Sequence, residues 1–291
     1  AATFKSTSGT MRVQGQFTNN GTFVHNTGTV ELDAASGPVT LTAPAASGSL
    51  YDLTVNGAGV TFTLAGILDV DNNLMITAGT LDAAGFDITV GGSWDNNGAF
   101  IHSGSTVTFN AGATGRIIEA GGSAFDDVVF SNALGGWTVQ TNALTCASLT
   151  LSTATSLSVN ADITTTGDCT LTSASALTVG SGVTLRVDGT FVNHVGGTWT
   201  GSTLDLNGSG TMTVNAKTDP GAAYGTLEIG PGLHVRLWNS SSSSQVVDAT
   251  GSLYSMDRGG NDGDLYIWGA YTVNDGATEY WSYATDFDGT A

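Results

Sequence analysis

The sequence has little positive charge. It has 7 Lys and Arg residues and 25 Asp and Glu residues, which gives a formal net charge of −18 at pH 7. A nucleic-acid backbone or an anionic membrane repels so acidic a chain at long range, so we expect neither as a partner. The scarcity of Lys and Arg also leaves few sites for trypsin-like proteases, which favours an extracellular or cell-surface location.

Long apolar segments and helical periodicity are missing as well. No apolar run reaches the roughly 18 residues that a membrane span needs, so we predict no membrane insertion. The opening residues Ala1–Phe4 have the character of a strand and not of a signal peptide. Either a leader has been removed or the chain belongs to a longer protein. No window combines helical periodicity with caps, which leaves an all-β fold.

The sequence instead contains short β-runs separated by Gly, Asn, Thr and Ser. It has 41 Gly against 4 Pro, and only 11% of its residues are charged, which is unusual for a globular enzyme. Apolar residues alternate with period two, as in Leu74–Ile76, Phe86–Val90 and Val183–Val187. This alternation predicts strands with one buried face.

The sequence also repeats itself. The segment Gly15–His25 returns 77 positions later (92 − 15) as Gly92–His102, and a weaker third copy begins at Gly189. Fixed-period repetition is typical of a solenoid, in which each coil buries its apolar face only against its neighbours. We therefore predict a parallel β-helix, or β-solenoid, with the shape of a rod.

A second landmark divides the repeats into units, because Leu50–Val55, Phe125–Phe130 and Tyr224–Ile229 share their apolar positions. We predict solenoid repeats over residues 1–230, in units of about 1–48, 49–123 and 124–222 and onward. An irregular, aromatic-rich C-terminal region follows at 231–291. Trp94, Trp137 and Trp199 should belong to the core or a corner stack. The other predicted core residues are Phe17, Phe23, Val30, Leu53, Leu81, Val90, Phe100 and Val107.

The pattern that runs from Leu50–Val55 through Ala78–Trp94 to Thr106–Phe109 resembles a known type of repeat. It is similar to the Gly/Asn-rich β-solenoid repeats of large secreted and cell-surface proteins of bacteria and archaea, often labelled adhesin-like or autotransporter-like. The resemblance covers roughly Gly15 to Ile229 and carries over no catalytic residues. It implies a structural protein, which serves as a subunit or segment of a surface stalk, fibre or filament whose copies assemble head to tail.

Two other functions stay open. A glycan-binding adhesin would use aromatic residues near the C-terminus, which could equally form a self-association surface or pack the end of the coil: Trp238, Trp268, Tyr271, Tyr280, Trp281 and Tyr283. A carbohydrate-active β-helix enzyme would need clustered carboxylates with a basic group, or a carboxylate pair across a sugar cleft. Adjacent Asp126 and Asp127 would instead point to opposite faces of a strand. We expect no enzymatic activity and no required cofactor.

The loop Asp257–Asp264 is the candidate cation site. Hard oxygen ligands on a Gly-rich loop suit Ca²⁺. Its candidate ligands, together with two acids of the tail, are Asp257, Asn261, Asp262, Asp264, Asp286 and Asp288. The spacing matches neither an EF-hand nor a nonapeptide calcium repeat, so ordinary acidic turns are the alternative.

Cys146 and Cys169 are the only cysteines. If Thr145–Leu151 and Asp168–Thr172 stack as neighbouring rungs, the two thiols come within disulfide reach. The alternative is two small apolar residues in the core. Neither cysteine has a CxxC or nearby His partner, so metal binding is not expected.

Two pairs of smaller motifs recur in the repeat. Asn19–Gly21 and Asn96–Gly98 are predicted to be turns, with stacked Asn side chains at a corner of the coil. His25 and His102 occupy the same repeat position, and we interpret them as solvent-facing residues.

Overall fold

The computed structural model describes residues 2–42, 48–172, 174–193, 197–208, 210–215, 224–229, 233–238, 246–249, 252–255, 272–273 and 279–280, with side chains described only before residue 209. These residues form an all-β parallel β-solenoid of about 10 turns without helices, which confirms the predicted fold class. Among the described residues there is accordingly no helix long and apolar enough to cross a membrane. The chain forms two compact units, Ala1–Ala147 and Ser148–Ala291.

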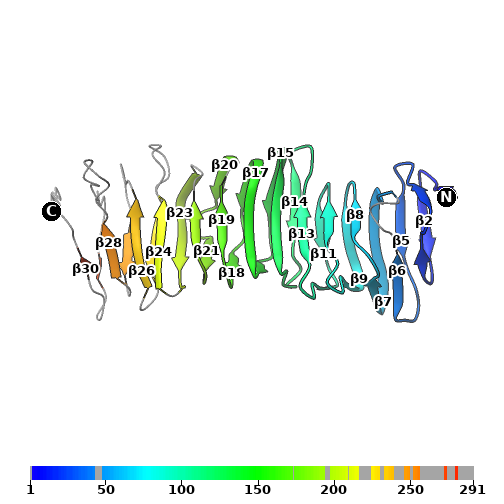
Figure 1. The fold of residues 1–291 in the computed structure, drawn as a ribbon, viewed down its shortest axis with the longest axis horizontal. Coiled ribbons are helices and arrows are strands. Elements are labelled where there is room, and N and C mark those ends of the chain that lie inside the picture. Colours follow the sequence, from blue (N-terminus) through cyan, green and yellow to red (C-terminus); the bar gives the residue numbers. More distant parts are fainter. Residues whose placement is uncertain are drawn as a thin grey trace. The chain divides into compact units, whose positions relative to one another are not determined.

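The first unit is a stack of short strands joined by tight corners (Figure 1). Its strands are β1 (Thr3–Lys5), β2 (Thr10–Val13), β3 (Phe17–Thr18), β4 (Thr22–Val24), β5 (Thr29–Leu32), β6 (Val39–Thr42), β7 (Asp52–Leu64), β8 (Leu68–Val70), β9 (Leu74–Asp82), β10 (Ile88–Val90), β11 (Trp94–Asn96), β12 (Ala99–Ile101), β13 (Thr106–Phe109), β14 (Arg116–Glu119), β15 (Asp127–Val139) and β16 (Leu144–Cys146).

The second unit continues the same construction. Its strands are β17 (Ser148–Val159), β18 (Ile163–Thr165), β19 (Cys169–Leu171), β20 (Ala174–Val179), β21 (Thr184–Val187), β22 (Phe191–Asn193), β23 (Gly197–Leu206), β24 (Gly210–Asn215), β25 (Tyr224–Ile229), β26 (Leu233–Trp238), β27 (Val246–Ala249), β28 (Ser252–Ser255), β29 (Thr272–Val273) and β30 (Glu279–Tyr280). The ladders β23–β25–β27–β29 and β24–β26–β28–β30 are parallel, so solenoid pairing extends beyond residue 230.

Each turn contributes three pairing segments, as β8 and β9 show. β8 pairs with β10, the first part of β9 (Leu74–Ile76) pairs with β11, and its last part (Thr80–Asp82) pairs with β12. The length of a turn is not constant in the first unit. The turn that begins at Thr10 brings Thr29 into register, whereas the turn that begins at Trp94 is longer and brings Ile118 into register.

The sequence repeat is not a whole number of turns. From Val30 the ladder passes through Leu53 and Leu74 and reaches Trp94 three turns later. Val107 is the residue that corresponds to Val30 in the sequence repeat, but it pairs with Ile88 and so belongs to a different ladder from Trp94. Equivalent residues of the sequence repeat therefore lie on different faces of the coil.

The core runs along the inside of the coil. Every predicted core residue is buried except Phe17, which is half-buried; Trp94, Trp137 and Trp199 are at most 1% exposed. In the first unit Trp94 packs against Phe100 and Phe125, with ring centroids 4.9 and 5.1 Å apart. Burial of side chains this large is the main stabilising term, because apolar surface leaves water.

Among the described residues the first coil pairs with a neighbouring turn on one side only, and Phe17 in this coil is half-buried. In the described residues β1 pairs only with β4, β2 only with β5 and β3 only with β6. Phe4 stacks on Phe23 with centroids 5.9 Å apart, yet it remains 54% exposed.

Candidate functional site

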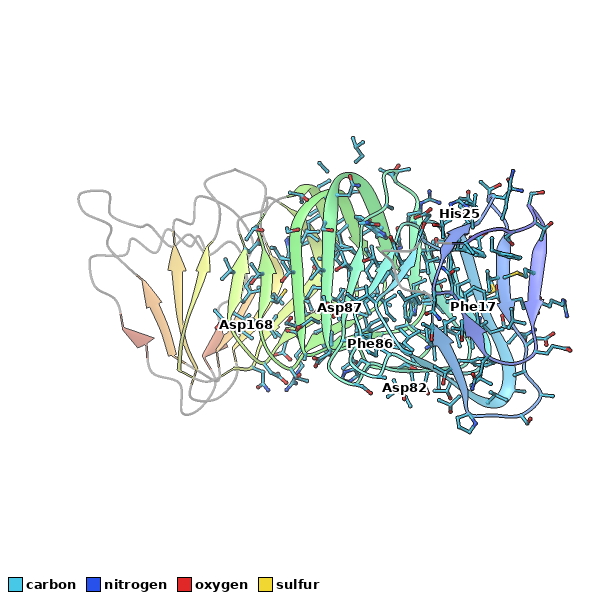
Figure 2. All side chains as sticks on the ribbon, turned by 45° about the vertical axis from the view of Figure 1, so that its right-hand side comes forward. Phe17, His25, Asp82, Phe86, Asp87 and Asp168 are labelled. Carbon is cyan, nitrogen blue, oxygen red and sulfur yellow. The ribbon has the colours of Figure 1, made fainter. Side chains whose placement is uncertain are left out.

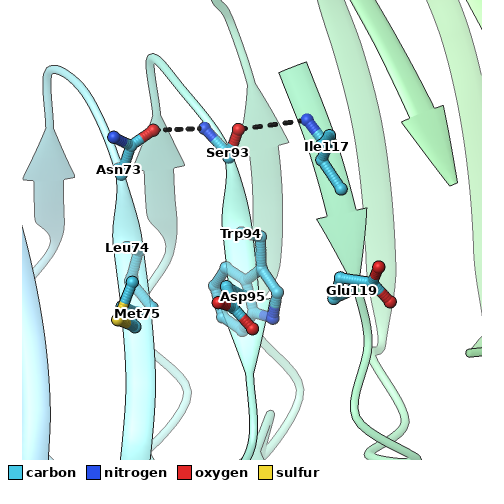
Figure 3. A pocket seen from close by; sticks show the side chains of 8 residues that line it. All are labelled: Asn73, Leu74, Met75, Ser93, Trp94, Asp95, Ile117 and Glu119. Carbon is cyan, nitrogen blue, oxygen red and sulfur yellow. Dashed lines mark hydrogen bonds between the residues drawn. The ribbon is translucent and has the colours of Figure 1, made fainter. Parts of the chain in front are cut away.

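A ladder of polar side chains runs along one corner of the first unit. The Oδ1 atom of Asp52 accepts a hydrogen bond from the backbone N–H of Asn73 at 3.0 Å, and Oδ1 of Asn73 accepts one from Ser93 N–H at 3.0 Å. Oγ of Ser93 then accepts from Ile117 N–H at 3.0 Å (Figure 3). Each side chain stands at the start of a strand and pairs an N–H of the next turn, which lengthens the parallel ladder by one bond.

The same contact recurs at other corners of both units. Oδ1 of Asp87 accepts from Thr106 N–H at 3.0 Å. In the second unit, Asp162 and Asp168 accept from Thr184 N–H and Thr190 N–H, both at 2.8 Å. Asp87 and Asp168 are labelled in Figure 2. These carboxylates connect successive turns, and this use of them was missed in the sequence, although each stands directly before an alternating run.

A shallow hollow of about 360 Å³ lies on the outer face of the first unit. Its walls come from β9, β11 and β14 and from the residues just before β9 and β11 (Figure 3). Met75 and Ile117 form apolar flanks that are 38% and 39% exposed. Asp95 and Glu119 are register partners on neighbouring strands, so their carboxylates stand side by side at the hollow.

Neighbouring polar groups hold both carboxylates of the hollow. Asp95 accepts from Nδ2 of Asn97 at 2.9 Å. Glu119 accepts from Oγ1 of Thr141 at 2.9 Å and from Nδ2 of Asn142 at 3.2 Å. No Lys or Arg in the part of the chain with described side chains forms an ion pair with either. The hollow is therefore an acidic surface with apolar flanks, and its shape does not enclose a small ligand.

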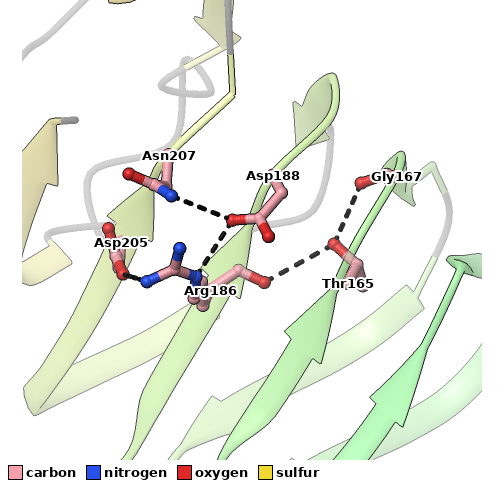
Figure 4. A network of polar contacts seen from close by, with 6 residues as sticks. All are labelled: Thr165, Gly167, Arg186, Asp188, Asp205 and Asn207. Carbon is pink, nitrogen blue, oxygen red and sulfur yellow. Dashed lines mark hydrogen bonds and ion pairs between the residues drawn. The ribbon is translucent and has the colours of Figure 1, made fainter. Parts of the chain in front are cut away.

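Two arginines form ion pairs with carboxylates of a neighbouring turn. Arg12 in β2 lies 3.3 Å from Glu31 and 3.2 Å from Asp33. In the second unit, Arg186 lies 2.9 Å from Asp188 and 3.3 Å from Asp205 (Figure 4). Nδ2 of Asn207 donates to Asp188 at 3.3 Å, so an amide completes the second network.

The electrostatics of the second network are dominated by burial. Burial raises the pKa of Asp205, the Arg186 guanidinium opposes that rise, and the Asp188 carboxylate adds to it. The single Arg186 guanidinium contacts both acids, and it does not fully offset the effect of burial on the pKa of Asp205. This arrangement holds neighbouring turns together.

His25 and His102 make the same local contact, as their shared repeat position suggests. Nδ1 of His25 accepts from Thr27 N–H at 2.9 Å, and Nδ1 of His102 accepts from Gly104 N–H at 3.2 Å. Nε2 of His25 lies 3.0 Å from Asp71, and its ring stacks on that of Tyr51 with centroids 5.4 Å apart. Both ring nitrogens of His25 therefore have a contact, one with the backbone of Thr27 and one with the carboxylate of Asp71.

The predicted calcium ligands all lie outside the described residues: Asp257, Asn261, Asp262, Asp264, Asp286 and Asp288. Of the predicted aromatic contact residues, Trp268, Tyr271, Trp281 and Tyr283 also lie outside them. Trp238 ends β26 and Tyr280 ends β30. Within the described ranges no group of three or more His, Cys, Asp or Glu side chains could hold a metal ion.

The structure corrects the register that was expected for Cys169. Its ladder partners are Leu149 on one side and Phe191 on the other, so Cys146 is not on its neighbouring rung. Leu149 comes after Cys146 in the chain, so the turn that ends at Cys169 is shorter than the spacing between the cysteines. Both cysteines are buried, and burial, with a smaller effect of Asp127, raises the pKa of the Cys146 thiol to about 12.

Comparison with protein-family models, with curated proteins and with solved structures gives no match. The features of the chain that bear on its function are those of the coil itself: its ladders and its acidic outer face.

Proposed function

We propose that the protein is an extracellular structural protein, a subunit or segment of a surface stalk, fibre or filament whose copies assemble end to end. The observation that carries this proposal is the parallel pairing of turn on turn, which repeats along the described residues. Strands β1, β2 and β3 of the first described coil each have one ladder partner among those residues, and Phe4 is 54% exposed. A further coil, from the same chain or from another copy, would pair with these strands in the same way and bury the ring.

The use of polar side chains supports the same function. Asp52, Asn73 and Ser93 accept backbone N–H groups of the next turn, and Arg12 and Arg186 bridge acids across turns. These groups stabilise the coil by linking successive turns; of those named, Asn73 and Ser93 also border the hollow on the first unit. This distribution fits a protein whose task is to be long and stable.

The charge favours one direction of assembly over another. With a net charge of −18, copies that approach side by side repel one another. An end contact between different surfaces is heterologous, and it continues as a filament when it does not close into a ring. Divalent cations, such as Ca²⁺ at the acidic loop Asp257–Asp264, would reduce the repulsion where copies meet.

Light scattering over a range of protein concentrations tests this proposal. We expect the average mass of the purified 291-residue chain to rise with concentration, and to rise further with added Ca²⁺. Phe4→Asp should shift the average mass towards that of the monomer, because it removes the exposed ring and adds charge to the first coil. Leu134→Asp is the control, because Leu134 is 68% exposed but belongs to β15.

A stable monomer at high concentration, unaffected by Ca²⁺, would exclude end-to-end assembly of this chain. An equal effect of the two substitutions would show that association does not use the first coil. A glycan array on the same preparation separates the structural function from an adhesin, because an adhesin binds sugars and a purely structural subunit does not.

A further inference from the structure

Two turns of the first unit place a reactive dipeptide in the same setting. Asn20-Gly21 and Asn97-Gly98 each follow another asparagine, and Asn20 and Asn97 are both exposed. An Asn-Gly bond is prone to deamidation because glycine lets its backbone nitrogen approach the asparagine side chain without steric hindrance. The nitrogen attacks Cγ, ammonia leaves as a succinimide ring closes, and water opens the ring to aspartate or isoaspartate.

No residue other than glycine fits after the asparagine in these two turns. A Cβ atom on Gly98 would lie 2.5 Å from the carbonyl oxygen of Gly79 and 2.9 Å from Cγ2 of Ile76. A Cβ atom on Gly21 would collide with the carbonyl oxygen of Ala2. The neighbouring turn approaches so closely that only glycine fits at either position.

The preceding asparagine engages the attacking nitrogen in both turns. The N–H of Gly21 donates to Oδ1 of Asn19 at 3.1 Å, and the N–H of Gly98 donates to Oδ1 of Asn96 at 3.0 Å. Ring closure requires this nitrogen to lose its proton and to turn towards the side chain of Asn20 or Asn97. A hydrogen bond to the preceding side chain opposes both changes.

The second turn has a further restraint. Nδ2 of Asn97 donates to Asp95 at 2.9 Å, which holds the reactive amide towards Asp95. Asn96 is itself only 1% exposed, and its Nδ2 donates to the carbonyl oxygen of Ala120 at 3.0 Å. The acceptor for Gly98 is thus anchored in the core, whereas Asn19, the acceptor for Gly21, is half-buried.

We infer that Asn20 and Asn97 are latent deamidation sites, and that the asparagine before each one protects it by holding the glycine N–H. The consequence is chemical durability. Isoaspartate at Asn97 would insert a methylene group into the backbone shortly before β12, and deamidation at either site adds negative charge to an acidic chain. Protection would preserve the register of the coil over the long life of an extracellular protein.

The experiment follows the two sites by peptide mass spectrometry during incubation at mildly alkaline pH, below the unfolding transition. In the folded protein we expect both sites to deamidate at least about tenfold more slowly than in the denatured chain, with Asn97 slower than Asn20. Asn19→Ala should accelerate deamidation at Asn20 by about fivefold, the effect expected for loss of one hydrogen bond. It should leave the rate at Asn97 unchanged.

Asn19→Asp is the matched control, because its carboxylate keeps an acceptor at the same place and should preserve protection. If Asn19→Ala and Asn19→Asp accelerate the reaction equally, the acceptor oxygen is not the protecting group and the inference is wrong. If Asn19→Ala disturbs the first coil, the wild-type comparison still decides: equal rates in the folded and denatured chains would overturn the proposal.

Discussion

Trp94 is the residue whose removal should damage the first unit most. Its side chain is fully buried, packs edge-on against Phe100 and tilted against Phe125, and lies in register between Leu74 and Ile118. Burial of roughly 200 Å² of a tryptophan side chain at about 25 cal/mol per Å² contributes about 5 kcal/mol. Measured Trp→Ala and Phe→Ala substitutions in cores cost about 3–5 kcal/mol.

The indole nitrogen of Trp94 reduces the loss of stability that we expect from Trp94→Ala. The Nε1 atom of Trp94 is buried and has no hydrogen-bond partner among the described residues. A buried donor without a partner costs about 1–3 kcal/mol, and this cost disappears when the indole is removed. We therefore expect Trp94→Ala to lower the free energy of unfolding by about 3 kcal/mol. Trp94→Phe should cost less than about 1.5 kcal/mol, because it keeps a ring and removes the unpaired donor.

Urea denaturation followed by circular dichroism measures both variants. Because a coil contacts only its neighbours, hydrogen exchange should locate the loss in the turns next to β11 and leave the second unit unchanged. A Trp94→Ala loss below about 1 kcal/mol, or a Trp94→Phe loss as large as that of Trp94→Ala, would refute the reasoning from ring burial.

Three other predictions concern a thiol, a carboxyl group and a glycine. The rise of the Cys146 pKa from its ordinary value of 9.0 to about 12 lowers the thiolate fraction near neutral pH about a thousandfold, so timed alkylation should label Cys146 only after denaturation; rapid labelling of the folded chain would contradict this. Burial and the nearby Asp71 raise the pKa of Asp69 above 3.8, so its charged form destabilises the fold at neutral pH and this penalty is lost as pH falls below that value. Thermal melts should accordingly show Asp69→Asn to be stabilising at neutral pH and neutral in strong acid, and a destabilised variant at neutral pH would disprove it. Gly98→Ala should lower the free energy of unfolding by about 1–3 kcal/mol because its Cβ meets the neighbouring turn, whereas Gly112→Ala, with nothing within 4 Å, is the control and should unfold like wild type in urea.

The fold was predictable because its signal is local and repeated. Alternation such as Leu74–Ile76 defines which side chains face inward, and the self-similarity of Gly15–His25 and Gly92–His102 indicates a solenoid. The turns were predictable for the same reason. Oδ1 of Asn19 and Oδ1 of Asn96 each accept from a glycine two positions later, a local contact that sequence alone determines.

The register between turns was not predictable. Turn length varies along the first unit, so a spacing in sequence does not say which residues stack. The spacing between Cys146 and Cys169 suggested neighbouring rungs, but Cys169 pairs with Leu149 and Phe191. Contacts across turns, such as Arg186 with Asp205, depend on this register and need the structure.

The acidity of the chain follows in part from the way its turns are joined. At several corners of the coil, the residue at the start of a strand faces a backbone N–H of the next turn. The side chain of that residue must therefore accept a hydrogen bond. A carboxylate has only acceptors, so Asp52, Asp87, Asp162 and Asp168 suit this position, whereas Lys and Arg have none. Four of the 25 acidic residues are therefore explained by the backbone they hold, without any cationic ligand. The same stacking brings like charges into register at Asp95 and Glu119, where the coil relies on neutral donors such as Asn97 and Asn142 in place of arginine.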